Sequence, residues 1–152
     1  MTHEIRLLGH ADAAVLEDVA DQVFDEVVNP AWAREFLADP RHHIVVALDG
    51  ATVIGFASAV HYIHPDKPPE LWINEVGVAP PYHRRGIGRQ LLGALLAHGR
   101  SLGCAQAWVL TEEDNEPARG LYEATGGVEE ACIMYTFSLQ AEAQGSHSPY
   151  PR

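Results

Sequence analysis

The chain has little cysteine and no long apolar run. Its 152 residues include only two cysteines, Cys104 and Cys132, which are too few for a disulfide framework and wrongly spaced for a zinc site. We therefore expect a reduced, cytoplasmic setting and no metal. No apolar run approaches the roughly 18 residues that a membrane span requires, and the first residues lack the basic and apolar regions of a signal peptide. The sequence thus predicts neither a targeting segment nor a membrane anchor.

Positive charge is scarce as well. Ten Lys and Arg residues stand against 21 Asp and Glu residues, for a formal net charge of −11. Such a balance disfavours binding to the phosphate backbone of DNA or RNA. It favours cationic partners, although the same excess of acid also serves plain solubility.

The apolar content is sufficient for one folded domain. Hydrophobic residues make up 47% of the chain and charged residues 20%, a composition that excludes wholesale disorder, and the length fits a single domain. We expect that domain to span residues 1–139. Residues 140–152, with their Gln, Gly, Ser, His and Pro, are expected to form a C-terminal tail outside the core.

The hydrophobic periodicity predicts an α/β chain in which strands come first and then alternate with helices. Apolar residues at helical spacing, such as Val15, Val19, Val23 and Val27, predict helices over residues 11–28, 31–37, 88–99 and 116–124. Runs rich in Val and Ile predict strands over residues 5–8, 42–48, 52–60, 71–79 and 105–110, and a final strand or pair of strands within 128–139. Asp49-Gly50 is a tight-turn pair, so the second and third strands should be antiparallel.

A glycine loop with clustered arginines separates the fourth strand from the next helix. Gly86 and Gly88 stand there among Arg84, Arg85 and Arg89, three of only ten basic residues. Free N–H groups at a helix start, the helix dipole and the close approach that glycine allows together form an anion site. A glycine pair alone can be a simple turn, but the arginines favour a pyrophosphate ligand. The loop is neither a P-loop nor a dinucleotide fingerprint.

Two motifs carry a family resemblance. The first is Val76-x-Val78-x-Pro80 followed by the glycine loop of residues 84–89, and the second is Asn-x-x-Ala-x-x-Leu-Tyr-x-x-x-Gly over residues 115–126. With these motifs the chain resembles the GNAT-superfamily N-acetyltransferases, which use acetyl-CoA, over residues 5–139. The resemblance implies the GNAT fold, an α/β (α+β) architecture whose central, mixed but mostly antiparallel sheet has six to seven strands flanked by about four helices.

The same resemblance implies roles for individual residues. Val76 and Val78 would bind the pantetheine arm through their backbones, Asn115 would touch that arm, and Tyr122 would be the acid that protonates the leaving thiolate. Tyr122 could alternatively be a core residue of a short helix. His83 stands where the family usually has Gln or Arg, which leaves its contact with CoA open. The full set of expected cofactor residues is Val76, Gly77, Val78, His83, Arg84, Arg85, Gly86, Ile87, Gly88, Arg89 and Asn115.

Glu75 is the candidate catalytic base. A primary amine that attacks the thioester directly must be neutral, so a base has to remove its proton. Strand alternation puts Glu75 on the face opposite Val76 and Val78, and desolvation there would raise the pKa of its carboxyl group. A solvated strand end or a salt bridge is the alternative interpretation. Other candidates are weaker: the imidazoles of His61, His64 and His83 as bases, and Ser58 and Cys104 as nucleophiles without a supporting motif.

The acceptor is predicted from a narrower resemblance. Residues 49–59, 70–78, 83–87 and 121–130 are similar to the aminoglycoside 3-N-acetyltransferases, in which an acidic residue, usually Asp, occupies the position of Glu75. That similarity implies a homodimer and a cationic aminoglycoside held by acidic residues, or else those residues form a solvated face. The acidic candidates are Asp25, Glu26, Glu112, Glu113 and Asp114, with Asp21 and Glu116 nearby.

Two alternatives to an aminoglycoside acceptor stay open. The acceptor could be the N-terminus of a peptide or ribosomal protein, or a small polyamine, because acceptor pockets vary among enzymes with similar cofactor loops. The chain could also be a non-catalytic module that binds acyl-CoA. The presence of Glu75, Asn115 and Tyr122 argues against the second alternative, because a protein that kept the fold but lost catalysis could lose all three residues.

Overall fold

The structure is a computed structural model that describes residues 2–141, and its centre is one five-stranded sheet with the order β1-β2-β3-β4-β5. The first four strands pair antiparallel, and β5 lies parallel to β4. The mixed, mostly antiparallel sheet is therefore confirmed. The strands are β1 (Glu4–Leu7), β2 (His42–Asp49), β3 (Thr52–Tyr62), β4 (Glu70–Val78) and β5 (Ala107–Val109).

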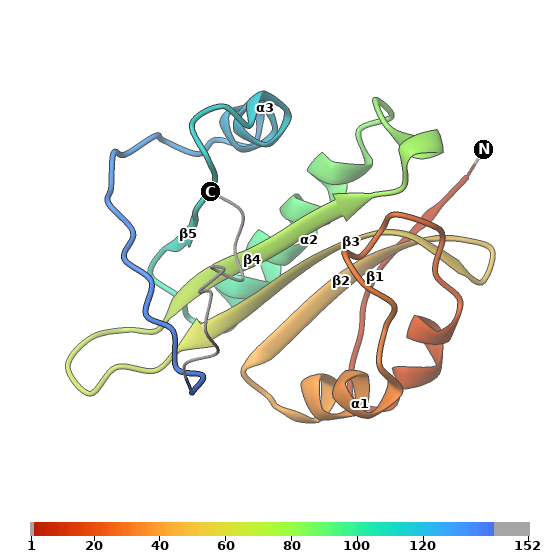
Figure 1. Cartoon of the computed structure of the whole chain (residues 1–152), viewed down its shortest axis with the longest axis horizontal. Coiled ribbons are helices and arrows are strands. Elements are labelled where there is room, and N and C mark those ends of the chain that lie inside the picture. The colour runs from red at the N-terminus through yellow and green to blue at the C-terminus, as the bar shows by residue number, and fades with distance from the viewer. Residues whose placement is uncertain (1, 142–152) are drawn as a thin grey trace.

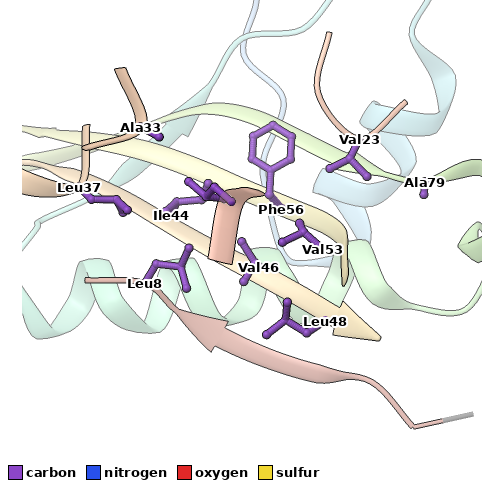
Figure 2. Packing of buried hydrophobic residues seen from close by; sticks show 11 residues of the cluster. Leu8, Val23, Ala33, Leu37, Ile44, Val46, Leu48, Val53, Phe56 and Ala79 are labelled. Carbon is purple, nitrogen blue, oxygen red and sulfur yellow. The ribbon is translucent and has the colours of Figure 1, made fainter. Parts of the chain in front are cut away.

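Helices cover both faces of the sheet (Figure 1). The helical elements are η1 (Ala13–Glu17) and η2 (Pro80–Tyr82), both 3₁₀ helices, and α1 (Pro30–Ala38), α2 (Ile87–Ser101) and α3 (Glu116–Ala124). The core is double: Ile44 and Val46 of β2 pack toward η1 and α1, whereas Val45 and Ala47 pack toward α2. Figure 2 shows the first of these clusters, to which Phe56 of β3 and Val23 both belong. Both faces of β2 are buried, which explains its continuous apolar run.

The predicted helix over residues 11–28 is wrong. Only η1 is helical there, and the following residues pair with β3 instead: Ala20 donates to the carbonyl of Val53, and Val53 donates to that of Asp18. The predicted apolar face was built from valines, and β-branched residues are poor helix formers that fit extended chain. Val27, counted in that face, is 96% exposed.

The predicted strand within residues 128–139 is absent from the structure, so the sheet has five strands rather than six or seven. The alternating Ile133, Tyr135, Phe137 and Leu139 are 79–96% exposed and belong to no described strand. Alternation specifies a strand only if a neighbour supplies hydrogen bonds, and β5, with three residues, offers a short edge. Three α-helices replace the expected four. The predicted tail, residues 140–152, lies outside the described residues from 142 onward.

The described residues hold no helix that is long and apolar enough to cross a membrane.

A chain of three histidines joins β2, β3 and α2 at the end of the sheet. The buried ring of His43 is hydrogen bonded on both sides, through Nε2 to Nδ1 of His61 at 2.8 Å and through Nδ1 to Nε2 of His98 at 2.9 Å. Burial, reinforced by the neighbouring imidazoles, lowers the pKa of His43 to about 4. The fold therefore requires a neutral His43.

This cluster predicts that acid destabilises the protein. The unfolded chain binds a proton at His43 near pH 6.5 but the folded chain only near pH 4, so stability is full above pH 6.5 and falls as the pH drops toward 4. We expect the free energy of unfolding in urea to decrease by about 2 kcal/mol between pH 7 and pH 5. His43→Leu should flatten that dependence, whereas His10→Gln, at an exposed position, should leave it unchanged. An equal slope in the His43→Leu variant would contradict the prediction.

Candidate active site

A pocket of about 450 Å³ opens where β4 and β5 diverge. The two strands pair through Leu71–Ile73 of β4, and beyond Ile73 no strand among residues 2–141 pairs with the outer edge of β4 (Figure 1). Residues from both sides of this opening line the pocket. They are Gln22, Val23, Asp25, Phe56, Asn74, Glu75, Val76, Gly77, Val78, His83, Leu110, Thr111, Asn115, Ala118 and Tyr122.

The free edge of β4 presents the backbone groups predicted to hold an extended ligand. Ala79 donates its N–H to Ile54 of β3 at 2.8 Å, and because backbone groups alternate in direction along a strand, those of Val78 and Val76 point away from β3. His83 reaches this edge, where its Nε2 lies 2.7 Å from the carbonyl oxygen of Val78. His83 therefore contacts the backbone edge on which the pantetheine is predicted to lie.

The loop before α2 has the shape of an anion cradle. Gly86 is the N-cap of α2 in a left-handed conformation, with φ +75°, and Arg84 also has a positive φ, of 61°. Such turns aim consecutive N–H groups toward one point. The amide N–H groups of residues 84–89 meet no acceptor within the described part of the chain. The loop thus fits the pyrophosphate of CoA through its backbone.

Two of the three loop arginines help to hold the loop in place. The guanidinium of Arg85 lies 5.4 Å from the ring centroid of Tyr82, whose hydroxyl donates to Asp49 at 2.6 Å. Arg89 donates to the carbonyl of Ala124 at the end of α3, at 3.4 Å. Arg84 is exposed. Of the three arginines, Arg84 is therefore the first candidate for a side-chain contact with phosphate. Arg85 and Arg89 also help to position α2 and α3.

Ile87 and Gly88 have packing roles that the motif does not reveal. Ile87 is buried in the core between α2 and the sheet, and a Cβ on Gly88 would meet the side chain of Leu121 in α3 at 3.5 Å. Only their backbone N–H groups are left for a ligand. Gly88 thereby allows α3 to approach the cradle closely.

Glu75 stands in the pocket beside Asp25. It pairs with Ser58 of β3, on the sheet face of Phe56 and opposite Val76, as alternation predicted. Burial, and secondarily the negative charge of Asp25, raise the pKa of the Glu75 carboxyl group. Glu75 is exposed and makes no salt bridge among residues 2–141, so the structure disfavours the structural ion pair, and the role of Glu75 as a base stays a prediction.

Gly77 brings Asp25 close to Glu75. A Cβ on Gly77 would lie 2.5 Å from the carbonyl oxygen of Val23, a distance that real Cβ atoms do not tolerate. Only glycine therefore lets the segment that carries Asp25 pass directly over β4. Gly77, which was predicted to bind the cofactor, lines the pocket, and its contribution there is this close approach.

Helix α3 contributes the opposite wall. Asn115 is the N-cap of α3, where its Oδ1 accepts from the N–H of Ala118 at 3.2 Å, and it lines the pocket together with Tyr122. Tyr122 is partly buried, and burial raises the pKa of its hydroxyl, which keeps the hydroxyl protonated and able to donate. At the end of α3, Gly127 donates to the carbonyl of Tyr122 at 2.8 Å and so secures the helix.

Several predicted residues lie outside the pocket. Of the acidic candidates only Asp25 lines it; Glu26, Glu112, Glu113 and Asp114 are exposed and contribute nothing to its walls. Sequence reasoning missed Gln22, Asn74, Leu110 and Thr111. The last two could have been found, because they directly follow β5 where that strand faces the motif strand β4.

The alternative nucleophiles and bases are placed elsewhere. His61 belongs to the histidine cluster, and His64 lies 2.8 Å from the carboxylate of Glu70. Ser58 is buried and Cys104 does not line the pocket. Across the described residues no three His, Cys, Asp or Glu side chains gather as a metal site. The pocket therefore combines an open strand edge, carboxylates and a tyrosine. The anion cradle of residues 84–89 does not line it but directly follows His83, which does.

Comparison with known proteins agrees with this geometry. Residues 13–127 match the model of the acetyltransferase (GNAT) family. The chain is 34% identical over 124 residues to the N-alpha-acetyltransferase RimI of Mycobacterium tuberculosis, an alignment that covers 80% of this chain and 76% of RimI.

Solved structures share the fold. An aminoglycoside acetyltransferase from an uncultured soil metagenomic sample, solved with sisomicin, has a TM-score of 0.77 and 18% identity, and the match covers 91% of this chain and 97% of that one. The aminoglycoside acetyltransferase AAC(6')-Iy, solved with a bisubstrate analogue built on CoA, has a TM-score of 0.75 and 23% identity, with coverage of 91% and 99%. The chain belongs to the GNAT family, and it is an N-acetyltransferase that uses acetyl-CoA.

Proposed function

We propose that this enzyme acetylates the α-amine at the N-terminus of a peptide or protein, with Glu75 as the base and Tyr122 as the acid. The observation that carries the chemistry is that both side chains line one pocket at the open edge of β4. The similarity to RimI over most of both chains supports an α-amine as the acceptor.

In the proposed reaction, separate residues act as base, as acid and as the cofactor site. Acetyl-CoA supplies the acetyl group, whose thioester C–S bond breaks as the amine nitrogen bonds to the carbonyl carbon. Glu75 takes the proton from the incoming ammonium, directly or through water, and the hydroxyl of Tyr122 donates a proton to the departing sulfur. The edge of Val76 and Val78 and the cradle of residues 84–89 hold the cofactor in line with Glu75.

An aminoglycoside acetylated at its 3-amino group is the second candidate. The adjacent carboxylates of Asp25 and Glu75 in a chain of net charge −11 favour a polycationic acceptor. The two aminoglycoside enzymes compared above are at most 23% identical to this chain. Similarity at that level supports a shared fold, and the acceptor has to be identified by experiment. The homodimer implied by the family resemblance stays a prediction.

An acceptor screen tests the proposal. The release of free CoA thiol from acetyl-CoA would be followed with peptides that differ only in a free or a blocked N-terminus, with gentamicin-type aminoglycosides and with spermidine. We expect the highest kcat/KM with free N-terminal peptides and none with blocked ones. Turnover on aminoglycosides alone would overturn the peptide proposal in favour of the second candidate.

A further inference from the structure

Three aromatic rings form a cluster on the sheet beside the pocket. The ring centroids of Trp72 and Trp108 are 5.1 Å apart, those of Tyr62 and Trp72 are 6.0 Å apart, and those of Tyr62 and Trp108 are 6.4 Å apart. The interplanar angles are only 5–15°. The three near-parallel rings are stacked with lateral offsets, and because all three separations are similar they form a compact cluster rather than a column. We call Tyr62, Trp72 and Trp108 the aromatic floor.

The aromatic floor lies on the same sheet face as Glu75. Trp72 of β4 is in register with Trp108 of β5. Asn74 is an extra residue in β4, where the pairing jumps from Ile73 to Glu75, so Trp72 and Glu75 share a face although they are three residues apart. The floor and the pocket are continuous along β5, because Leu110, which lines the pocket, lies two residues beyond Trp108.

No described helix covers this part of the sheet. The helices η1 and α1 pack on the same face, but their core cluster is drawn from β2 and β3 and contains none of the three rings. Tyr62 is 37% exposed, and both tryptophans are partly exposed. Among residues 2–141 the floor is therefore a partly exposed apolar surface that no helix covers and that ends at the pocket.

Carboxylates stand at both ends of the floor. Glu75 marks the pocket end, and Glu70, in register with Tyr62, marks the other. The carboxylate of Glu70 accepts a hydrogen bond from Gln106 and lies 2.8 Å from Nε2 of His64. The bond from Gln106, followed by that from His64, lowers the pKa of Glu70, so this carboxylate is anionic at neutral pH.

We propose that the aromatic floor binds a cationic side chain of the acceptor, an arginine or lysine that follows the reacting amine. An electron-rich tryptophan face between two carboxylates attracts a cation far more than a neutral group. Because Trp72 pairs with Val60 and Glu75 with Ser58, the two side chains are about 7 Å apart along the sheet, which is the spacing between residues one and three of an extended peptide. Because side chains one and three of an extended peptide point the same way, the floor selects a cation at the third position. This inference rests on the proposed peptide acceptor.

The test uses matched peptides and the intrinsic fluorescence of the floor. In a Trp32→Phe background only Trp72 and Trp108 report, because the chain has three tryptophans. The probes are Ala-Ala-Arg-Ala-Ala-amide and the same peptide with uncharged norleucine at the third position. We expect the arginine peptide to quench the fluorescence with a Kd, and to be acetylated with a KM, on the order of tenfold lower. Equal values for the two peptides would overturn the inference.

Variants of the floor provide the second arm. Trp108→Leu and Trp72→Leu should each remove most of the advantage of the arginine peptide, while kcat with the norleucine peptide stays near that of the wild type. Trp32→Leu on α1, where Trp32 is 69% exposed, is the control and should keep the advantage. If both floor variants keep it, the floor does not bind the cation.

The two proposals fail in different ways. If the arginine peptide quenches the fluorescence but is not acetylated, cation binding by the floor is supported and the peptide acceptor is contradicted. If both peptides are acetylated with equal KM, the peptide acceptor is supported and cation binding by the floor is contradicted. If the peptides neither bind nor react, both proposals are wrong.

Discussion

Replacing Glu75 by glutamine is expected to lower kcat by about 100-fold or more, because glutamine keeps the size of the side chain but cannot take a proton. The raised pKa of Glu75 also predicts the shape of the pH profile. The base works only when deprotonated, so kcat/KM of the wild type should fall as the pH decreases through that raised pKa. The Glu75→Gln variant should lose this acid limb. The measurement is initial-rate kinetics from pH 5 to pH 9 at saturating acetyl-CoA.

Asp25 offers an independent check of the same assignment. Its negative charge is the secondary cause of the raised pKa of Glu75, after burial, so Asp25→Asn should move the acid limb to lower pH without abolishing activity. Glu26→Gln is the matched control, since Glu26 is exposed and does not line the pocket. An acid limb that persists unchanged in Glu75→Gln would show that another group is the base.

Replacing Gly86 by aspartate is expected to weaken CoA binding by about 100-fold or more. The new carboxylate would stand at the anion cradle, where it repels phosphate, and a φ of +75° adds backbone strain to a residue with a Cβ. Gly86→Asn separates the two effects, because asparagine has the size of aspartate and adopts this conformation about equally well but carries no charge; we expect a smaller loss. Isothermal titration calorimetry with CoA measures both.

The control for the cradle lies on the same helix. Gly93 is exposed on α2, with open space around its Cβ position, so Gly93→Asp adds the same charge away from the cradle. It should bind CoA like the wild type, and it should not destabilise the helix, because aspartate is a better helix former than glycine. Retained affinity in Gly86→Asp would place the pyrophosphate elsewhere.

The local patterns predicted most of the elements and the cofactor side of the pocket. Asp49-Gly50 correctly indicated the β2–β3 hairpin, and the glycine loop correctly indicated a strand that ends before a helix start. These predictions hold because turn residues and helix starts depend on neighbours in sequence. The valine-based helix over residues 11–28 failed because the hydrogen bonds of residues 18–20 go to β3, a partner that periodicity does not record.

The acceptor side depends on contacts between distant segments. Sequence spacing placed Glu75 on the correct face, but it could not choose Asp25 over Glu112 or Asp114, since that choice follows from the close approach of Val23 to Gly77. The aromatic floor joins the ends of three strands and went unrecognised.

The sequence by itself thus determined the family, the cofactor and the two cofactor motifs. These features depend on loops and helix caps, which short runs of residues encode. The tertiary structure alone decided which carboxylate stands beside Glu75 and that Tyr62, Trp72 and Trp108 meet. The physical reason is that strand register, the bulge at Asn74 and the packing of one loop over Gly77 are set by long-range pairing.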